Sequence, residues 1–127
     1  MTTDVVRARY REALDHHRAA VDALVPLAIE MAFTTLREAL PTAHAIETRS
    51  EFTEDWLRTL RIERVLDETG TAIFDIDDGH PDPVVEEAIA LVGVDYLDLL
   101  LDLTGDQYTG GARIARPADG DARPFAD

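Results

Sequence analysis

Residues 57–76 read LRTLRIERVLDETGTAIFDI, and this stretch decides the fold class. Leu60 and Ile62 alternate with charged neighbours, which is the period of two expected of a strand with one buried face. A second apolar run, residues 71–76, follows the polar segment 67–70. Two strand-like runs joined by a short polar loop that ends in glycine predict an antiparallel hairpin. The spacing of Trp56, Leu57, Leu60, Arg64 and Val65 would also fit a helix, which is the alternative.

Upstream of the hairpin, residues 43–49 form a third candidate strand, and residues 50–55 follow as a polar connection. Residues 4–40 precede them and carry apolar side chains at a 3.6-residue rhythm. We therefore predict one long N-terminal helix, with Thr3 as its N-cap and Pro41 as its stop.

The length of this helix bears on assembly. At a rise of ~1.5 Å per residue, the segment is about 55 Å long, whereas a domain of this size has a diameter of roughly 35–40 Å. Pro26 is expected to kink or split the helix, because proline lacks the donor N–H and clashes with the preceding turn. Otherwise the overhang needs cover from a second copy, so a homodimer is expected ahead of a monomer.

Two short helices are predicted downstream. Asp82 can cap a helix that begins at Pro83 and runs to about Val92. After an interrupting glycine, a second helix covers residues 96–103 and closes at Gly105.

The predicted fold class is α+β, in the order α-β-β-β-α-α. A long kinked helix packs on a three-stranded antiparallel sheet, and two short helices follow. Residues 1–112 are expected to form the single domain, and residues 113–127 a flexible C-terminal tail.

Composition narrows the function. The chain has no cysteine, which excludes disulfides, zinc–thiolate sites and thiol nucleophiles. No secretory signal is recognised, and the longest apolar candidate, residues 21–33, is interrupted by Asp22, Pro26 and Glu30, so neither secretion nor membrane insertion is expected. A cytoplasmic location is the expectation.

The negative charge is concentrated in one third of the chain. The formal net charge is −14, and all twelve basic residues are arginine, a balance that disfavours direct nucleic-acid binding. Residues 70–111 carry no basic side chain. Their acidic residues, which are the predicted partner-binding residues, are Asp75, Asp77, Asp78, Asp82, Glu86, Glu87, Asp95, Asp98, Asp102 and Asp106.

Asp95, Asp98 and Asp102 follow i, i+3, i+7 spacing and predict one solvent-facing stripe on the last helix. Like charges at this spacing cost a few tenths of a kcal/mol per pair, so stability alone does not explain them. A docking surface for a basic protein is one interpretation, and a face kept for solubility is the other.

No catalytic arrangement is recognised. The four histidines lie at positions with no shared spacing, and Ser50 is the single serine. Trp56 could anchor a partner, but a single aromatic residue in a sheet is more often part of the core, and the core is the expectation. No catalytic residue, metal ligand or cofactor is therefore predicted. The acidic loop that contains Asp75, Asp77, Asp78 and Asp82 leaves open a weak site for a divalent cation.

These observations predict a non-enzymatic acidic protein that binds a basic partner protein, for example a nucleic-acid-binding protein, through residues 75–106. Inhibitors, immunity proteins or antitoxins, secretion chaperones and nucleic-acid mimics are the matching classes. The alternatives are a structural homodimerisation domain with incidental acidity and a small divalent-metal-binding protein.

Overall fold

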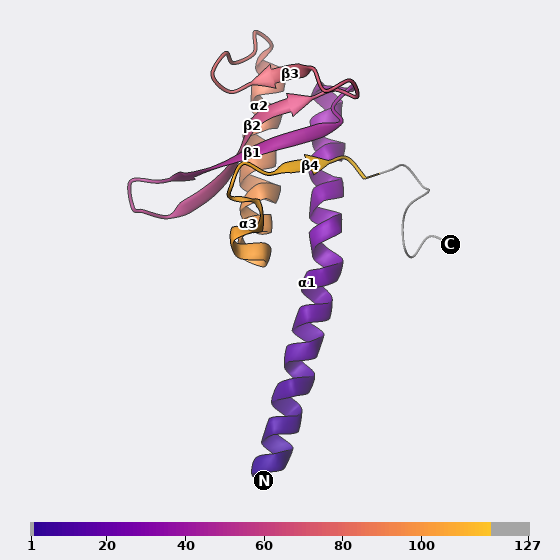
Figure 1. Cartoon of the computed structure of the whole chain (residues 1–127), viewed down its shortest axis with the longest axis vertical. Coiled ribbons are helices and arrows are strands. Elements are labelled where there is room, and N and C mark those ends of the chain that lie inside the picture. Colours follow the sequence, from indigo (N-terminus) through magenta and orange to yellow (C-terminus); the bar gives the residue numbers. More distant parts are fainter. Residues whose placement is uncertain (1, 118–127) are drawn as a thin grey trace, which may run out of the picture.

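The computed structural model describes residues 2–117 and confirms the α+β class (Figure 1). A long helix comes first, three strands follow, a helical segment comes next, and a short strand closes the order. The elements are α1 (Thr3–Ala39), β1 (Ala45–Phe52), β2 (Arg58–Leu66), β3 (Ala72–Asp75), α2 (Pro83–Val92), a π-helical turn (Gly93–Leu97), α3 (Asp98–Thr104), a 3₁₀ turn (Gly105–Tyr108) and β4 (Arg113–Ala115).

The sheet has the order β3-β2-β1-β4, and every neighbouring pair is antiparallel. It therefore has four strands where three were predicted. The extra strand, β4, pairs Ile114 with Ile46 of β1, and Ile114 is buried. The predicted domain boundary at residue 112 is thus wrong. A strand of only three residues is too short to show the alternation of apolar and polar side chains from which a strand is predicted. Residues 118–127 of the predicted tail lie outside the described residues.

The hairpin of β2 and β3 confirms the prediction made from residues 57–76. Its turn is held by the Asp67 carboxylate, which accepts hydrogen bonds from the Thr69 amide (3.0 Å), the Thr69 hydroxyl (2.7 Å) and the Thr71 amide (3.0 Å). Gly70 has a φ of 86°, a left-handed conformation that glycine adopts without steric cost.

The second hairpin, made by β1 and β2, is longer than predicted. Residues 50–52 continue β1 instead of starting a loop, and Phe52 pairs with Arg58. Beyond the helices this hairpin projects as a two-stranded ribbon (Figure 1). Both of its faces meet water there, so residues 50–55 are mostly polar and resemble a connection in sequence.

All helices lie on one face of the sheet, and the core forms between them. The C-terminal part of α1 contributes Ala28, Ala32, Phe33 and Leu36, and Ala28 is the first buried residue of the chain as described. The other large buried side chains are Leu40 after α1; Ile46, Leu60, Ile62, Val65, Leu66, Phe74 and Ile114 from the strands; and Val85, Ile89, Val92, Leu97 and Leu100 from the later helical segment.

The part of α1 that precedes Ala28, its first buried residue, projects from this core (Figure 1). We call this part the arm. From Thr2 to Ala20 every residue is exposed except the half-buried Leu14. The predicted overhang is therefore present. Pro26 does not split the helix, and its N-cap is Thr2 rather than Thr3, because the Thr2 hydroxyl oxygen accepts the Val5 amide at 3.4 Å.

By length and composition, α1 also meets the criteria for a membrane-spanning helix, with a mean hydropathy of 1.6 over its most apolar 18 residues. Core helices of soluble proteins and N-terminal signal sequences meet the same criteria, and four residues of α1 are buried in the core described above.

The two C-terminal helices are continuous rather than separated at Gly93. Asp82 caps α2 as predicted, and its carboxylate accepts the Val84 amide at 2.9 Å. The chain then stays helical through the π-helical turn, in which the Asp98 amide donates to the Gly93 carbonyl. Asp95 is thus an interior residue of a continuous helical segment.

Candidate interaction surfaces

The exposed large hydrophobic side chains of the described residues gather in three patches. One lies along α1, one at the tip of the β1–β2 hairpin and one on the outer side of α2. Their members are Val5, Val6, Tyr10, Leu24, Leu27 and Met31 on α1; Phe52, Trp56 and Leu57 at the tip; and Val84, Leu91 and Val94 on and just after α2. Large apolar side chains that gather on a surface mark a contact with another molecule more often than scattered ones do.

The ten predicted acidic residues divide into three groups by their contacts. Three carboxylates hold the chain's own turns: Asp75 accepts the Asp77 amide (2.9 Å), Asp82 caps α2, and Glu86 accepts the His80 amide (2.7 Å). These contacts give three of the acidic residues in and around the loop between β3 and α2 a structural role.

A second group pairs with arginines of the strands. Asp98 lies 2.7 Å from Arg61, Asp106 pairs with Arg58, and Asp77 lies 3.9 Å from Arg49. The third group makes no side-chain hydrogen bond or ion pair within residues 2–117. It consists of Asp78, Glu87, Asp95 and Asp102, all of them exposed.

The predicted stripe of Asp95, Asp98 and Asp102 is therefore wrong at its middle residue. Asp98 faces the edge of β2, where it accepts the Leu60 amide at 3.4 Å besides pairing with Arg61. The π-helical turn inserts an extra residue into the helical repeat, which moves the faces on either side out of register.

Gly93 permits this arrangement. Its carbonyl accepts a hydrogen bond from Arg61 at 3.3 Å, and a Cβ atom at position 93 would lie 2.9 Å from the Arg61 Cδ. The missing side chain lets the guanidinium reach across the helix to Asp98. Together, Arg61 and Asp98 cover a stretch of β2 that the short strand β3 leaves without a strand neighbour.

The outer face of α2 combines exposed apolar and acidic side chains. Val84, Leu91 and Val94 are 60%, 45% and 59% exposed, and Glu87 and Asp95 stand beside them at helical spacing. We call these five residues the α2 face.

A small apolar pocket adjoins the α2 face. It has a volume of about 250 Å³ and lies between α2 and the strands β2 and β3. Its lining residues are Arg61, Ile62, Phe74, Ile76, Glu86, Ile89, Ala90 and Val94. Since Val94 belongs to both, the pocket can receive a side chain from a molecule that covers the α2 face.

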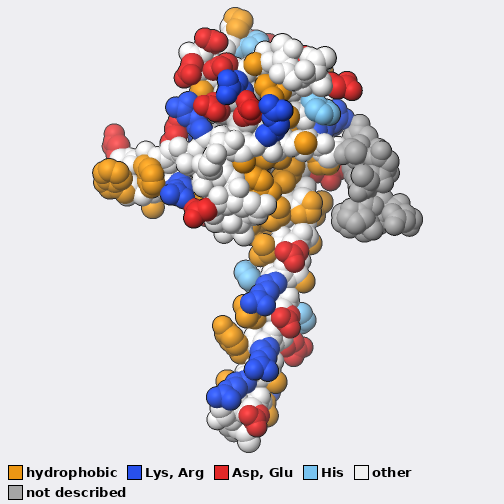
Figure 2. All heavy atoms as spheres, viewed as in Figure 1, with side chains coloured by type: hydrophobic (Ala, Val, Ile, Leu, Met, Phe, Trp, Pro, Cys, Tyr) orange, Lys and Arg blue, Asp and Glu red, His pale blue; other side chains and the backbone are white. Residues whose placement is uncertain are grey.

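The outer face of the sheet, turned away from the helices, is covered by ion pairs. Glu47 lies 2.8 Å from Arg64 and 3.3 Å from Arg113, and these residues are direct neighbours across β2, β1 and β4. Acidic and basic side chains alternate over this face (Figure 2). Most of the arginines outside α1 are thus held beside the sheet. The α2 face contains no arginine.

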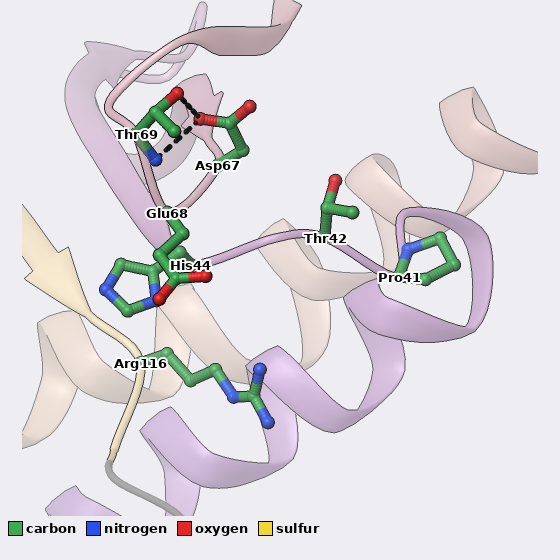
Figure 3. A pocket seen from close by; sticks show the side chains of 7 residues that line it. All are labelled: Pro41, Thr42, His44, Asp67, Glu68, Thr69 and Arg116. Carbon is green, nitrogen blue, oxygen red and sulfur yellow. Dashed lines mark hydrogen bonds between the residues drawn. The ribbon is translucent and has the colours of Figure 1, made fainter.

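A second, more open pocket of about 400 Å³ lies at the end of the sheet near residue 44 (Figure 3). Acidic and basic side chains line it together: His44, Arg116, Glu68 and Asp67. Hydrogen bonds from the Thr69 hydroxyl, then from the backbone amides of Thr71 and Thr69, hold the pKa of Asp67 below its usual value. That carboxylate holds its own turn.

The divalent-cation alternative gains no support from the geometry. In the part of the chain that the structure describes, no three His, Asp or Glu side chains are placed to hold a metal ion. Two of the four candidate carboxylates, Asp75 and Asp82, accept backbone amides instead.

Trp56 was predicted in the core, and this prediction is wrong. It is 80% exposed at the tip of the β1–β2 hairpin, with a left-handed φ of 61°. Its ring centroid lies 6.2 Å from that of Phe52, and the Arg58 guanidinium lies 5.3 Å from the Phe52 centroid. A period-two pattern gives a side chain's face on the strand, but it does not tell whether that part of the ribbon is covered.

Comparison with known protein families, curated proteins and solved structures finds no match to this chain.

Proposed function

We propose that the protein is a non-enzymatic, cytoplasmic binding protein whose α2 face holds a basic partner protein. One observation carries the proposal: three exposed apolar side chains stand beside two acidic residues that have no ion pair among the described residues. Surface acids kept for solubility alone need no apolar neighbours.

The two kinds of side chain have different roles in binding. Apolar anchors at the centre of an interface, such as Leu91 and Val94, supply most of the affinity once water is excluded. Acidic residues around them attract a basic partner, raise the association rate and disfavour acidic competitors. The partner that fits is a basic segment with its own apolar side chains, such as an amphipathic helix.

The proposed surface is narrower than residues 75–106. Asp98 and Asp106 form ion pairs with Arg61 and Arg58, and Asp75, Asp82 and Glu86 accept backbone amides. We assign the attraction to Glu87 and Asp95 of the α2 face and to Asp102, which is exposed on α3 further along the same helical segment. An inhibitor, immunity protein or antitoxin, chaperone or nucleic-acid mimic would each use a surface of this kind.

The test begins with a photo-crosslinking residue at position 94 and the protein that it captures in the native host. Association and dissociation rates with that purified protein are then measured against salt. Glu87→Gln/Asp95→Asn/Asp102→Asn should slow association roughly tenfold at low salt and flatten its salt dependence. Leu91→Ser should instead accelerate dissociation, because it removes an anchor.

The matched control is Asp15→Asn/Glu38→Gln/Glu68→Gln, which removes the same charge from exposed positions away from the α2 face. It should bind like the wild type. If the control slows association as much as the α2 variant, net charge alone is responsible and the proposed surface is wrong.

A further inference from the structure

An apolar seam runs along the arm and continues to Met31, on a side of α1 distinct from its core-facing side. Eight residues from Val6 to Met31 follow one another at alternating steps of four and three, and all but His17 are apolar. They are Val6, Tyr10, Ala13, His17, Ala20, Leu24, Leu27 and Met31. Alternating steps of three and four are the heptad spacing of helices that pack along their length.

All eight seam residues are exposed, including Tyr10 at 67% and Leu24 at 40%. The core lies against another side of the helix, which presents Ala32, Phe33 and Leu36. Apolar side chains are visible along the projecting arm in Figure 2. Within residues 2–117, no other element covers the seam.

A helix of this length needs such cover. Isolated helices in water gain little from intrinsic propensity, and most helical stability in proteins comes from packing of an apolar face. The arm also contains Pro26, which removes one backbone hydrogen bond and destabilises the helix further.

We propose that the seam pairs with the same seam of a second copy, with the two α1 helices antiparallel. In one register every seam residue meets a seam residue of the partner. Tyr10 then lies opposite the partner's Leu27, His17 opposite the partner's Ala20, Leu24 opposite the partner's Ala13, and Met31 opposite the partner's Val6. The bulky Leu24 and His17 each face an alanine, a complementarity that lets helices approach closely.

Charge favours the antiparallel direction. In this register Arg9, which flanks the seam near the free end, lies beside the partner's Glu30. On the other flank of the seam, Leu14 lies beside the partner's Val21, and this pair is apolar. A parallel pair would instead bring Arg7 and Arg9 of both copies, which flank the seam, together at one end. Like charges at close range destabilise such a pair.

Sedimentation equilibrium tests the dimer in the micromolar range. The wild type should have about twice the 14.1 kDa mass of one chain. Tyr10→Glu/Leu24→Glu should be monomeric, because it would place four carboxylates in the buried seam. Val84→Glu/Leu91→Glu, the matched control at similarly exposed apolar positions on the α2 face, should stay dimeric.

Disulfide trapping tests the direction, since the chain contains no cysteine of its own. In the proposed register, Ala13→Cys of one chain faces Leu24→Cys of another, so a mixture of the two variants should give a covalent heterodimer under oxidation. Each variant alone should not crosslink, because its two cysteines would lie about 16 Å apart along the axis, beyond disulfide reach. Arg9→Glu should weaken the dimer, and Arg9→Glu/Glu30→Arg should restore it.

A monomeric wild type would overturn the proposal, and so would a dimer that survives Tyr10→Glu/Leu24→Glu. Crosslinking of Ala13→Cys with itself would refute the antiparallel direction. A monomer that binds lipid vesicles through the seam would give the apolar face a different occupant. The α2 face and its partner are tested with other residues, so either proposal can fail alone.

Discussion

Three aspartates of one helical segment have different roles. Asp98 joins the sheet edge through Arg61 and the Leu60 amide, whereas Asp95 and Asp102 are exposed and make no side-chain contact in the described part of the chain. In sequence they are equivalent members of a repeat. In space, the neighbours of Asp98 give it a structural role, whereas Asp95 and Asp102 stay exposed and can contact another molecule.

Asp98→Ala is therefore expected to destabilise the fold by about 1–2 kcal/mol, because it leaves Arg61 and the Leu60 amide without their shared acceptor. Asp95→Ala and Asp102→Ala should change the free energy of unfolding by less than about 0.5 kcal/mol. Urea denaturation of the three variants measures the difference. Equal effects at all three positions would contradict the assignment of Asp98 to the sheet edge.

The lowered pKa of Asp67 predicts a pH-dependent contribution to the free energy of unfolding. Its pKa is lower in the folded protein, chiefly because the Thr69 hydroxyl donates to the carboxylate. The ionised form thus stabilises the folded state above the unfolded pKa of ~3.9, and this contribution is lost as the pH falls through the lower folded pKa. The stability gap between wild type and Asp67→Asn should be constant near neutral pH and shrink below pH ~4.

Chemical denaturation at a series of pH values measures that gap. Thr69→Val removes the hydroxyl donor alone and should reproduce part of the Asp67→Asn effect at neutral pH. A gap that widens on acidification would show that the turn does not depend on the ionised carboxylate.

At the scale of the element, the tip of the β1–β2 hairpin holds a bulky aromatic residue in a left-handed conformation. For an L-residue this backbone costs roughly 1–2 kcal/mol, and glycine adopts it freely. Trp56→Gly is expected to raise the free energy of unfolding by about 1 kcal/mol, since the exposed ring contributes little burial. Loss of stability in this variant would mean that the ring packs more closely than its exposure indicates.

The same exposure predicts a spectroscopic property. Trp56 is the single tryptophan of the chain, so its fluorescence reports on the hairpin tip alone. Its emission should resemble that of tryptophan in water, shift little on unfolding, and be quenched readily by iodide. A strong blue shift in the native protein would show that another molecule, or a second copy, covers the tip.

At the scale of the whole molecule, the structure divides into a packed head and a projecting arm. Deletion of residues 2–20 removes no buried side chain, so the head should keep its fold and its core. If the arm pairs two copies, the melting temperature of the full chain should rise with protein concentration, and that of the deletion variant should not. Scanning calorimetry at several concentrations measures both, and a deletion variant that fails to fold would place part of the core in the arm.

The sequence by itself determined the features that depend on neighbours along the chain. These are the long N-terminal helix, the turn at residues 67–70, the Asp82 cap of α2 and the excess of acidic residues. Periodicity, capping and turn chemistry act over a few residues and can be recognised there.

Only the tertiary structure decided which side chains are covered and which charges are paired. Residues 113–115 become a strand because β1 offers them an edge, and Gly93 has a role in the helix because its missing side chain leaves room for Arg61. Asp98 turns inward because Arg61 and the Leu60 amide offer it partners, and Trp56 stays outside because its ribbon extends beyond the helices. Burial and ion pairing depend on contacts between residues far apart in sequence, and the local sequence pattern does not predict such contacts.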